Sequence, residues 1–195
     1  MKLKNALTLI MEGPHDKNKK KAIFLSGMPG SGKTEFYKKV LDDKNLKRLD
    51  TDIIYSYLVK KSESDDIKDP KNYDKYGKEV GEKLKSLNRL YTKNELGLVI
   101  DSTGGNSSKI LKIKNDLEAK GYDTCMVFIK TPVKSSFDRI KKRERGVDKD
   151  YAKNIYKKLN KNVELYKSAF NKFWEVNNEK DYLSLEGPIQ NFLRS

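Results

Sequence analysis

Short apolar runs along the chain alternate with longer stretches whose apolar residues recur every three or four positions. An apolar run of about four to eight residues is typical of a buried strand, and the wider spacing is typical of a helix with one buried face. We expect five strands, at residues 22–26, 45–52, 97–101, 123–130 and 173–176. Because helical stretches separate these strands, the pattern predicts an α/β fold, a parallel sheet covered by helices on both faces.

The helical stretches differ in how clearly their ends are marked. Apolar residues with helical spacing are expected to lie on helices just after residue 34 and at residues 53–60, 80–91, 107–120, 133–140 and 151–170. Either Asn106 or Ser107 can cap the fourth of these helices, and Gly121 can end it. The polar stretch 62–76 is predicted to be a loop or insertion, and Gly187-Pro188 is expected to open a last helical turn within a short tail.

One domain accounts for the whole pattern. A chain of 195 residues is long enough for a single α/β domain with its own core. No internal repeat and no interdomain linker is evident, so we expect residues 22–195 to form one domain and residues 1–21 to form a basic N-terminal extension.

A glycine-rich loop follows the first predicted strand. Its sequence fits G-x-x-x-x-G-K-[ST] and consists of Gly27, Met28, Pro29, Gly30, Ser31, Gly32, Lys33 and Thr34. Strand, loop and helix in this order turn successive backbone N–H groups toward a phosphate at the positive end of a helix. A flexible glycine–serine turn would not need these flanking elements. The loop therefore predicts a site for a nucleoside triphosphate, with Lys33 at the β- and γ-phosphates and the Thr34 hydroxyl at Mg²⁺.

Acidic residues end the second and third predicted strands, at the edge of a parallel sheet where ligands bind. Asp101 has the position of an acid that holds Mg²⁺ directly or through water, although an acid there could instead cap the following turn. Asp52 is the candidate to accept a proton from a substrate hydroxyl as its oxygen attacks the γ-phosphate. Asp50 is its competitor, because a register shift of one residue would exchange the two side chains, and a third possibility is that neither serves as the base.

Basic residues are concentrated between Lys134 and Lys161, where eleven lysines and arginines stand against four acids. Arg139 and Arg143 are four residues apart and therefore share one face of a helix. Guanidinium groups over a transferring phosphoryl group stabilise its charge, and a closing arginine segment excludes water. We expect a lid at about residues 139–150, while a helix with a solvated basic face is the plainer alternative.

The overall charge and the rarity of cysteine and histidine narrow the class of protein. A formal net charge of +14 favours acidic partners such as nucleotides or nucleic acids, although general lysine richness would also account for it. The lone Cys125 cannot form an internal disulfide, and the lone His15 cannot build a metal site. Without a signal peptide or a membrane-spanning run, we expect a soluble protein of the cytoplasm, or of the host cytoplasm if a phage encodes it.

The chain resembles the P-loop kinases grouped as bacteriophage polynucleotide kinases and zeta-toxin-like kinases, over about residues 22–176. The motifs that carry the resemblance occur in the same order: the loop 27–34, Asp52, Val99–Thr103 and Arg139–Gly146. The resemblance implies a P-loop NTPase fold of the kinase type, with three αβα layers and a five-stranded parallel sheet. It also implies that Lys33 and Thr34 serve phosphate and Mg²⁺, Asp52 the acceptor hydroxyl, and Arg143 the phosphates.

Two features depart from the phage branch of that group. Its members carry an arginine three residues after the acceptor-binding aspartate, and that position is Tyr55 here. They also commonly carry a phosphatase domain, for which this chain has no room. A tyrosine can stack on a base or a sugar, but it cannot clamp a phosphate.

The sequence thus predicts a phosphotransferase that uses ATP and Mg²⁺ and has an alcohol group as acceptor. The 5′-OH of a nucleic acid is the first choice of acceptor, because the positive charge attracts polyanions. A UDP-amino sugar, as in zeta-like toxins, is the alternative acceptor. A nucleotide-controlled nucleic-acid-binding module with little chemistry is the alternative from another class, and a slow ATPase is a third possibility.

Overall fold

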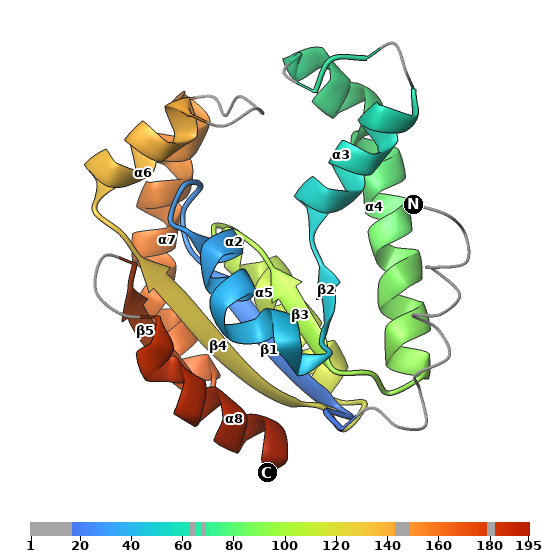
Figure 1. Cartoon of the computed structure of the whole chain (residues 1–195), viewed down its shortest axis with the longest axis vertical. Helices are drawn as coiled ribbons and strands as arrows, with labels where there is room; N and C mark the ends of the chain where they lie inside the picture. The colour runs from blue at the N-terminus through green and yellow to red at the C-terminus, as the bar shows by residue number, and fades with distance from the viewer. Residues whose placement is uncertain (1–16, 63–64, 68, 143–148, 179–181) are drawn as a thin grey trace.

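A five-stranded, all-parallel sheet forms the centre of the protein (Figure 1). The computed structural model describes residues 17–62, 65–67, 69–142, 149–178 and 182–195. The strands are β1 (Lys21–Ser26), β2 (Lys47–Leu49), β3 (Leu98–Asp101), β4 (Asp123–Lys130) and β5 (Phe173–Asn177), in the order β2-β3-β1-β4-β5. The predicted five-stranded parallel sheet is confirmed.

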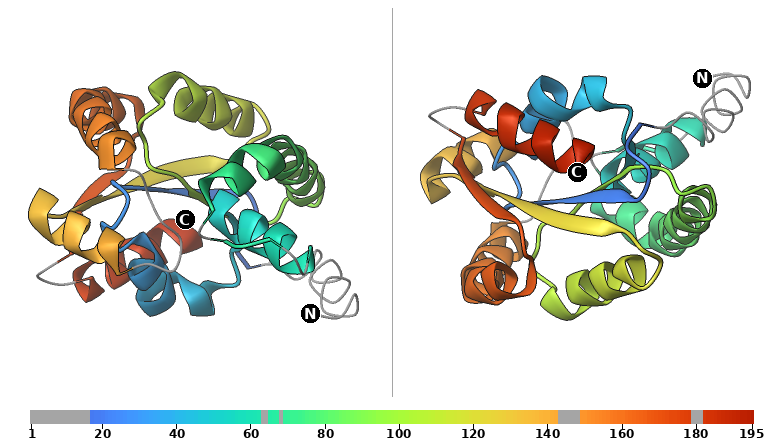
Figure 2. Two further views of the ribbon diagram at one scale, coloured as in Figure 1. Left: turned by 90° about the horizontal axis from the view of Figure 1, so that it is seen from above. Right: turned by 90° about the horizontal axis from the view of Figure 1, so that it is seen from below.

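Helices cover both faces of this sheet (Figure 2). On one face lie α2 (Lys33–Phe36), its continuations η2 (Tyr37–Leu41) and η3 (Asp42–Lys44), and the C-terminal helix α8 (Glu186–Arg194), which follows the turn η4 (Leu183–Leu185). The other face carries α5 (Ser107–Glu118) and α7 (Lys149–Ala169). Side chains of β1 point alternately to the two layers, with Ile23 and Leu25 toward α2 and α8 and Phe24 toward α5 and α7. The three predicted layers are therefore present.

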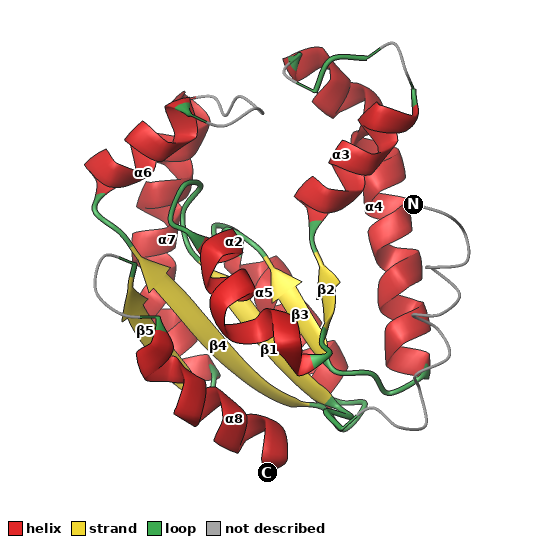
Figure 3. Cartoon of the chain, in the orientation of Figure 1, coloured by secondary structure: helices red, strands yellow, loops and turns green. Residues whose placement is uncertain are grey.

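Two helical elements rise beyond the carboxyl ends of the strands, one on each side of the glycine loop (Figure 3). The pair α3 (Thr51–Lys61) and α4 (Pro70–Lys93) packs together through a small core that includes Tyr55, Leu58 and Val80. Helix α6 (Val133–Lys141) follows β4 and stands opposite them. Any ligand above the loop therefore lies between α3 and α6.

Three predicted boundaries are wrong, and local interactions explain each. The second strand ends at Leu49 because the Asp50 side chain accepts from the Asp52 N–H at 2.7 Å and starts α3. Much of the predicted loop 62–76 is the start of α4, since Asp69 caps this helix and proline suits its first position. The expected short tail is a nine-residue helix, α8, held by its buried apolar face.

Candidate active site

The glycine loop joins β1 to α2 with a backbone that glycine makes possible. Gly30 and Gly32 have φ angles of 80° and 94°, in the left-handed region that side chains disfavour. A Cβ atom on Gly30 would collide with the carbonyl oxygen of Ser136 in α6, and one on Gly32 would lie 2.5 Å from the Asn178 amide nitrogen. The loop is therefore packed between α6 and the segment that follows β5.

Side chains from the ends of β4 and β5 fix the loop in place. The Ser31 carbonyl accepts hydrogen bonds from Thr131 Oγ1 at 2.9 Å and from Asn178 Nδ2 at 2.6 Å. Tyr182 in turn donates its hydroxyl proton to Asn178 Oδ1. Burial, and then the charge of Glu35, raise the pKa of Tyr182 to about 12, so this hydroxyl remains a donor throughout the neutral range.

Lys33 lies over the loop, as a phosphate-binding lysine requires. Its ammonium donates to the carbonyls of Gly27 and Met28 at 2.7 and 3.3 Å. It is the first residue of α2, and the next residue, Thr34, is exposed. A cation and a free hydroxyl thus stand together at the positive end of the loop helix.

Buried polar atoms near the loop lack partners within the described residues. They are Ser31 Oγ in the loop, Ser102 Oγ just after β3, and Ser136 Oγ and one terminal nitrogen of Arg139 in α6. Buried polar groups in proteins are nearly always hydrogen-bonded, so such a cluster is typical of a site that binds a polar ligand. A phosphate bearing several acceptor oxygens suits these donors.

The acids at the strand ends lie close together and share one arginine. β2 and β3 pair in parallel with Leu49 opposite Ile100, so Asp50 comes beside Asp101. Arg48 Nη2 contacts Asp50 Oδ2 at 2.7 Å and Asp101 Oδ2 at 2.5 Å, and all three side chains are nearly buried. Burial first, and then the charge of Asp101, raise the pKa of Asp50 from 3.8 to about 6, while Arg48 acts in the opposite direction.

Asp52 occupies the first turn of α3 and is exposed, whereas Asp50 is taken up by capping this helix and by Arg48. Of the two candidate bases, Asp52 is therefore the one accessible to an acceptor. Tyr55 is only 1% exposed and packs edge-on to Tyr76, so the expectation that it could stack on a base or a sugar is wrong. Of the two lid arginines, Arg139 lies on α6 beside the loop, and Arg143 lies outside the described residues.

Sequence reasoning missed Arg48, Asn178 and Tyr182. Arg48 stands two residues before Asp50 on a strand, and this spacing places the two side chains on one face. That signal was available in the sequence. The contacts of Asn178 and Tyr182 with the loop have no comparable signal in the sequence. Asn178 lies 147 residues from Ser31, and Tyr182 lies 150 residues from Gly32.

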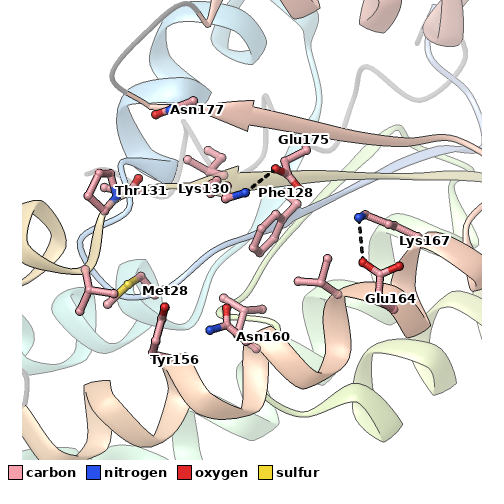
Figure 4. Close-up of a pocket in the computed structure, with 15 residues that line it drawn as sticks. Met28, Phe128, Lys130, Thr131, Tyr156, Asn160, Glu164, Lys167, Glu175 and Asn177 are labelled. Atoms are coloured by element: carbon pink, nitrogen blue, oxygen red, sulfur yellow. Dashed lines mark hydrogen bonds and ion pairs between the residues drawn. The ribbon is translucent and has the colours of Figure 1, made fainter.

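A cavity of about 450 Å³ lies on the α7 side of the sheet, behind the glycine loop (Figure 4). Met28 and Phe128 form part of its apolar wall. The lysines at its rim are already paired with acids, Lys130 with Glu175 at 3.1 Å and Lys167 with Glu164 at 2.8 Å. Because these charges balance, the cavity does not suit a triphosphate.

The residues present fit a Mg²⁺ ion that is shared with a bound nucleotide. The Arg48 guanidinium pairs with the carboxylates of both Asp50 and Asp101. When both carboxylates are ionised, these three side chains together carry one net negative charge. Thr34 offers an exposed hydroxyl. No group of three or more histidine, cysteine or acidic side chains able to hold a metal occurs in the described part of the chain, so phosphate oxygens would have to complete the ligand set.

Comparisons with known proteins identify the family of this chain. The zeta toxin family model matches residues 5–182, which include the loop, the strand-end acids and α6. The chain belongs to the zeta toxin family. No curated protein sequence matches it significantly.

Three solved structures with a similar fold are a chain from a toxin–antitoxin system and two kinases. A chain from the PezAT chromosomal toxin–antitoxin system of Streptococcus pneumoniae is 22% identical, with a TM-score of 0.64 over 92% of this chain and 75% of that one. Shikimate kinase from Acinetobacter baumannii, in complex with shikimate, is 16% identical with a TM-score of 0.54, over 93% and 96% of the two chains. Deoxyadenosine kinase from M. mycoides, with bound dATP, is 18% identical with a TM-score of 0.53, over 89% and 99%.

This zeta toxin family member is accordingly a kinase of the P-loop type, a nucleotide-binding phosphotransferase. The link to phage polynucleotide kinases has no counterpart among these matches. No helix in the ranges that the structure describes has the length and apolarity needed to span a membrane.

Proposed function

We propose that this protein transfers the γ-phosphate of ATP to a hydroxyl of a nucleotide-activated amino sugar, as zeta-like toxins do. The burial of Tyr55 is the observation that favours this acceptor over a nucleic-acid end. The polynucleotide kinases that the sequence resembles place a phosphate-clamping arginine at this position of α3, and here the side chain is 1% exposed within the α3–α4 core. A 5′ nucleic-acid end would therefore lack that cation.

Each residue of the site has a distinct task in this reaction. The loop amides and Lys33 hold the β- and γ-phosphates, and Arg139 and Arg143 stabilise the charge of the transferring phosphoryl group. Asp52 orients the acceptor hydroxyl and accepts its proton as the oxygen attacks phosphorus. Thr34 and Asp101, together with phosphate oxygens, would hold Mg²⁺, which would neutralise charge on the phosphates.

A second candidate acceptor is the 5′-OH of a nucleic acid. The observation in its favour is the exposed lysine face of α7, which carries Lys153, Lys157, Lys158 and Lys161. Such a face attracts a polyanion, but it also attracts acidic proteins, and it does not place a strand end at Asp52. It ranks second for that reason.

The deciding experiment offers [γ-³²P]ATP and Mg²⁺ to the full chain with UDP-N-acetylglucosamine, UDP-glucose or a 5′-OH oligonucleotide in parallel. We expect label on the amino sugar, and none after Lys33→Ala. Label on the oligonucleotide end would replace this proposal with the second candidate. Label in free phosphate alone would identify an ATPase, and no label together with salt-sensitive oligonucleotide binding would favour a nucleotide-controlled binding module.

A further inference from the structure

One arginine connects the two sides of the site, the side of the metal and the side of the acceptor. The same nitrogen of Arg48, Nη2, contacts Asp101 Oδ2 at 2.5 Å and Asp50 Oδ2 at 2.7 Å. Asp101 ends β3, and Asp50 caps α3, the helix that carries Asp52 in its first turn. Arg48 thus lies between the carboxylate proposed for Mg²⁺ and the helix that presents the proposed base.

The surroundings of Arg48 hold its guanidinium in one place. The side chain is 11% exposed, and the guanidinium carbon lies 4.5 Å from the centre of the Tyr37 ring, a cation–π contact with η2. η2 directly continues the loop helix α2. The contact with Tyr37 therefore fixes Arg48 relative to the structural unit that carries Lys33 and Thr34.

We propose that Arg48 is a positioning residue for phosphoryl transfer, and this inference rests on the proposed function. By tying Asp50 to Asp101, it sets the position of α3 and hence of the Asp52 carboxylate relative to the phosphate loop. By occupying one oxygen of Asp101, it also limits how strongly that carboxylate binds a metal ion. Arg48 touches neither substrate, and it acts only through the two aspartates.

The two roles predict effects of opposite sign when the guanidinium is removed. Transfer should become slower, because a displacement of about 1 Å in a reacting group can cost on the order of a hundredfold in rate. Metal binding should become tighter, because both oxygens of Asp101 become free to bind the cation. A change that merely loosened the fold would weaken both.

The test uses Arg48→Lys and the double variant Arg48→Met with Asp50→Asn. The lysine keeps a charge but cannot bridge two carboxylates while lying flat on Tyr37. The double variant removes the link without leaving two unpaired carboxylates in the interior, a change that often unfolds proteins. Arg194→Met, at an exposed position of α8, is the control for loss of a single positive charge.

Two readouts are needed. Binding of Mn²⁺ to each protein with ADP and no acceptor is followed by electron paramagnetic resonance. It should be on the order of fivefold tighter in the double variant, in which both oxygens of Asp101 are free while the net charge at the strand ends is unchanged, and nearly unchanged in the other two. The kcat of label transfer should fall on the order of 10- to 100-fold in the double variant and less in Arg48→Lys, with the KM for ATP within about twofold. Arg194→Met should leave both readouts as in the wild type.

Two results would overturn the positioning role. One is a double variant with unchanged kcat, and the other is metal binding and transfer that weaken in parallel. Failure of the proposed function itself looks different, because the wild-type protein would then transfer no label to any acceptor. The Mn²⁺ measurement would still decide whether Arg48 restrains Asp101.

Discussion

The charge of Asp50 gives a prediction about stability that can be worked out from its surroundings. Asp50→Asn keeps a side-chain oxygen that can accept from the Asp52 N–H, because asparagine and aspartate cap helices about equally well. The substitution removes one of the two carboxylates that share Arg48, and Asp101 remains paired with it. Loss of the charge is therefore the main difference between the two proteins.

The magnitude follows from the shift in pKa. Burial and the charge of Asp101 raise the pKa of Asp50 from 3.8 to about 6, so the folded protein binds this proton more tightly than the unfolded chain does. The free energy of unfolding must then decrease as the pH rises between about 4 and 6, and it stays lower above that range. A shift of roughly two units corresponds to a loss of up to about 3 kcal/mol. Asp50→Asn lacks this loss.

The assay is urea unfolding followed by circular dichroism, at intervals from about pH 4 to pH 7.5, with both proteins in the same buffers. The stability of the variant relative to the wild type should rise by up to about 3 kcal/mol across this range and then level off. Because other titrating groups are common to both proteins, only the difference between the two curves is interpreted. A constant difference at all pH values would refute the reasoning, and so would a variant that loses stability relative to the wild type above about pH 6.

Four further predictions concern the loop, the base and the core. Lys33→Ala should weaken ATP binding at least tenfold by calorimetry, and ATP binding equal to that of the wild type would contradict its role. Asp52→Asn should keep ATP affinity within about twofold and lose on the order of a hundredfold or more in transfer, and full transfer would contradict its role as the base. Gly30→Ala should reduce nucleotide affinity with a smaller loss of stability, because the new methyl group collides with the Ser136 carbonyl, and unchanged affinity would argue against a rigid loop. Phe192→Ala should lower the free energy of unfolding by about 3–5 kcal/mol, because the ring is 1% exposed and packs against Trp174. A loss below about 1 kcal/mol would show that α8 contributes little to the core.

Much of the fold could be predicted from the sequence, because buried parallel strands form continuous apolar runs. The predicted fourth strand, residues 123–130, coincides with β4, and the alternation of strands and helices gave the correct class. The missed start of α4 has a local signal in retrospect, since Asp69 caps it and Pro70 is suited to the first turn. The helix α8 also has one, because Ile189, Phe192 and Leu193 have helical spacing.

The sequence alone could predict the candidate site only where a short motif specifies the function of its residues. The loop 27–34 is such a motif, and Asp101 ends its strand as predicted, whereas Asp52, predicted to end the second strand, lies in the first turn of α3. The bridge made by Arg48 requires knowledge that β2 lies next to β3, an arrangement that no local pattern specifies. Likewise, the burial of Tyr55 depends on how α3 packs against α4, so the sequence left open a binding role that the structure removes.

The hydrogen bonds that hold the Ser31 carbonyl have a consequence for how the protein is made. Their donors, Thr131 and Asn178, follow Ser31 in the sequence by 100 and 147 residues. A ribosome finishes the glycine loop long before it supplies these donors, and contacts so distant in sequence form late in folding. A nascent chain that lacks β5 therefore carries the complete phosphate-binding motif without the contact from Asn178. We therefore expect the nucleotide-binding loop to reach its final shape only after the last strand of the sheet has been made.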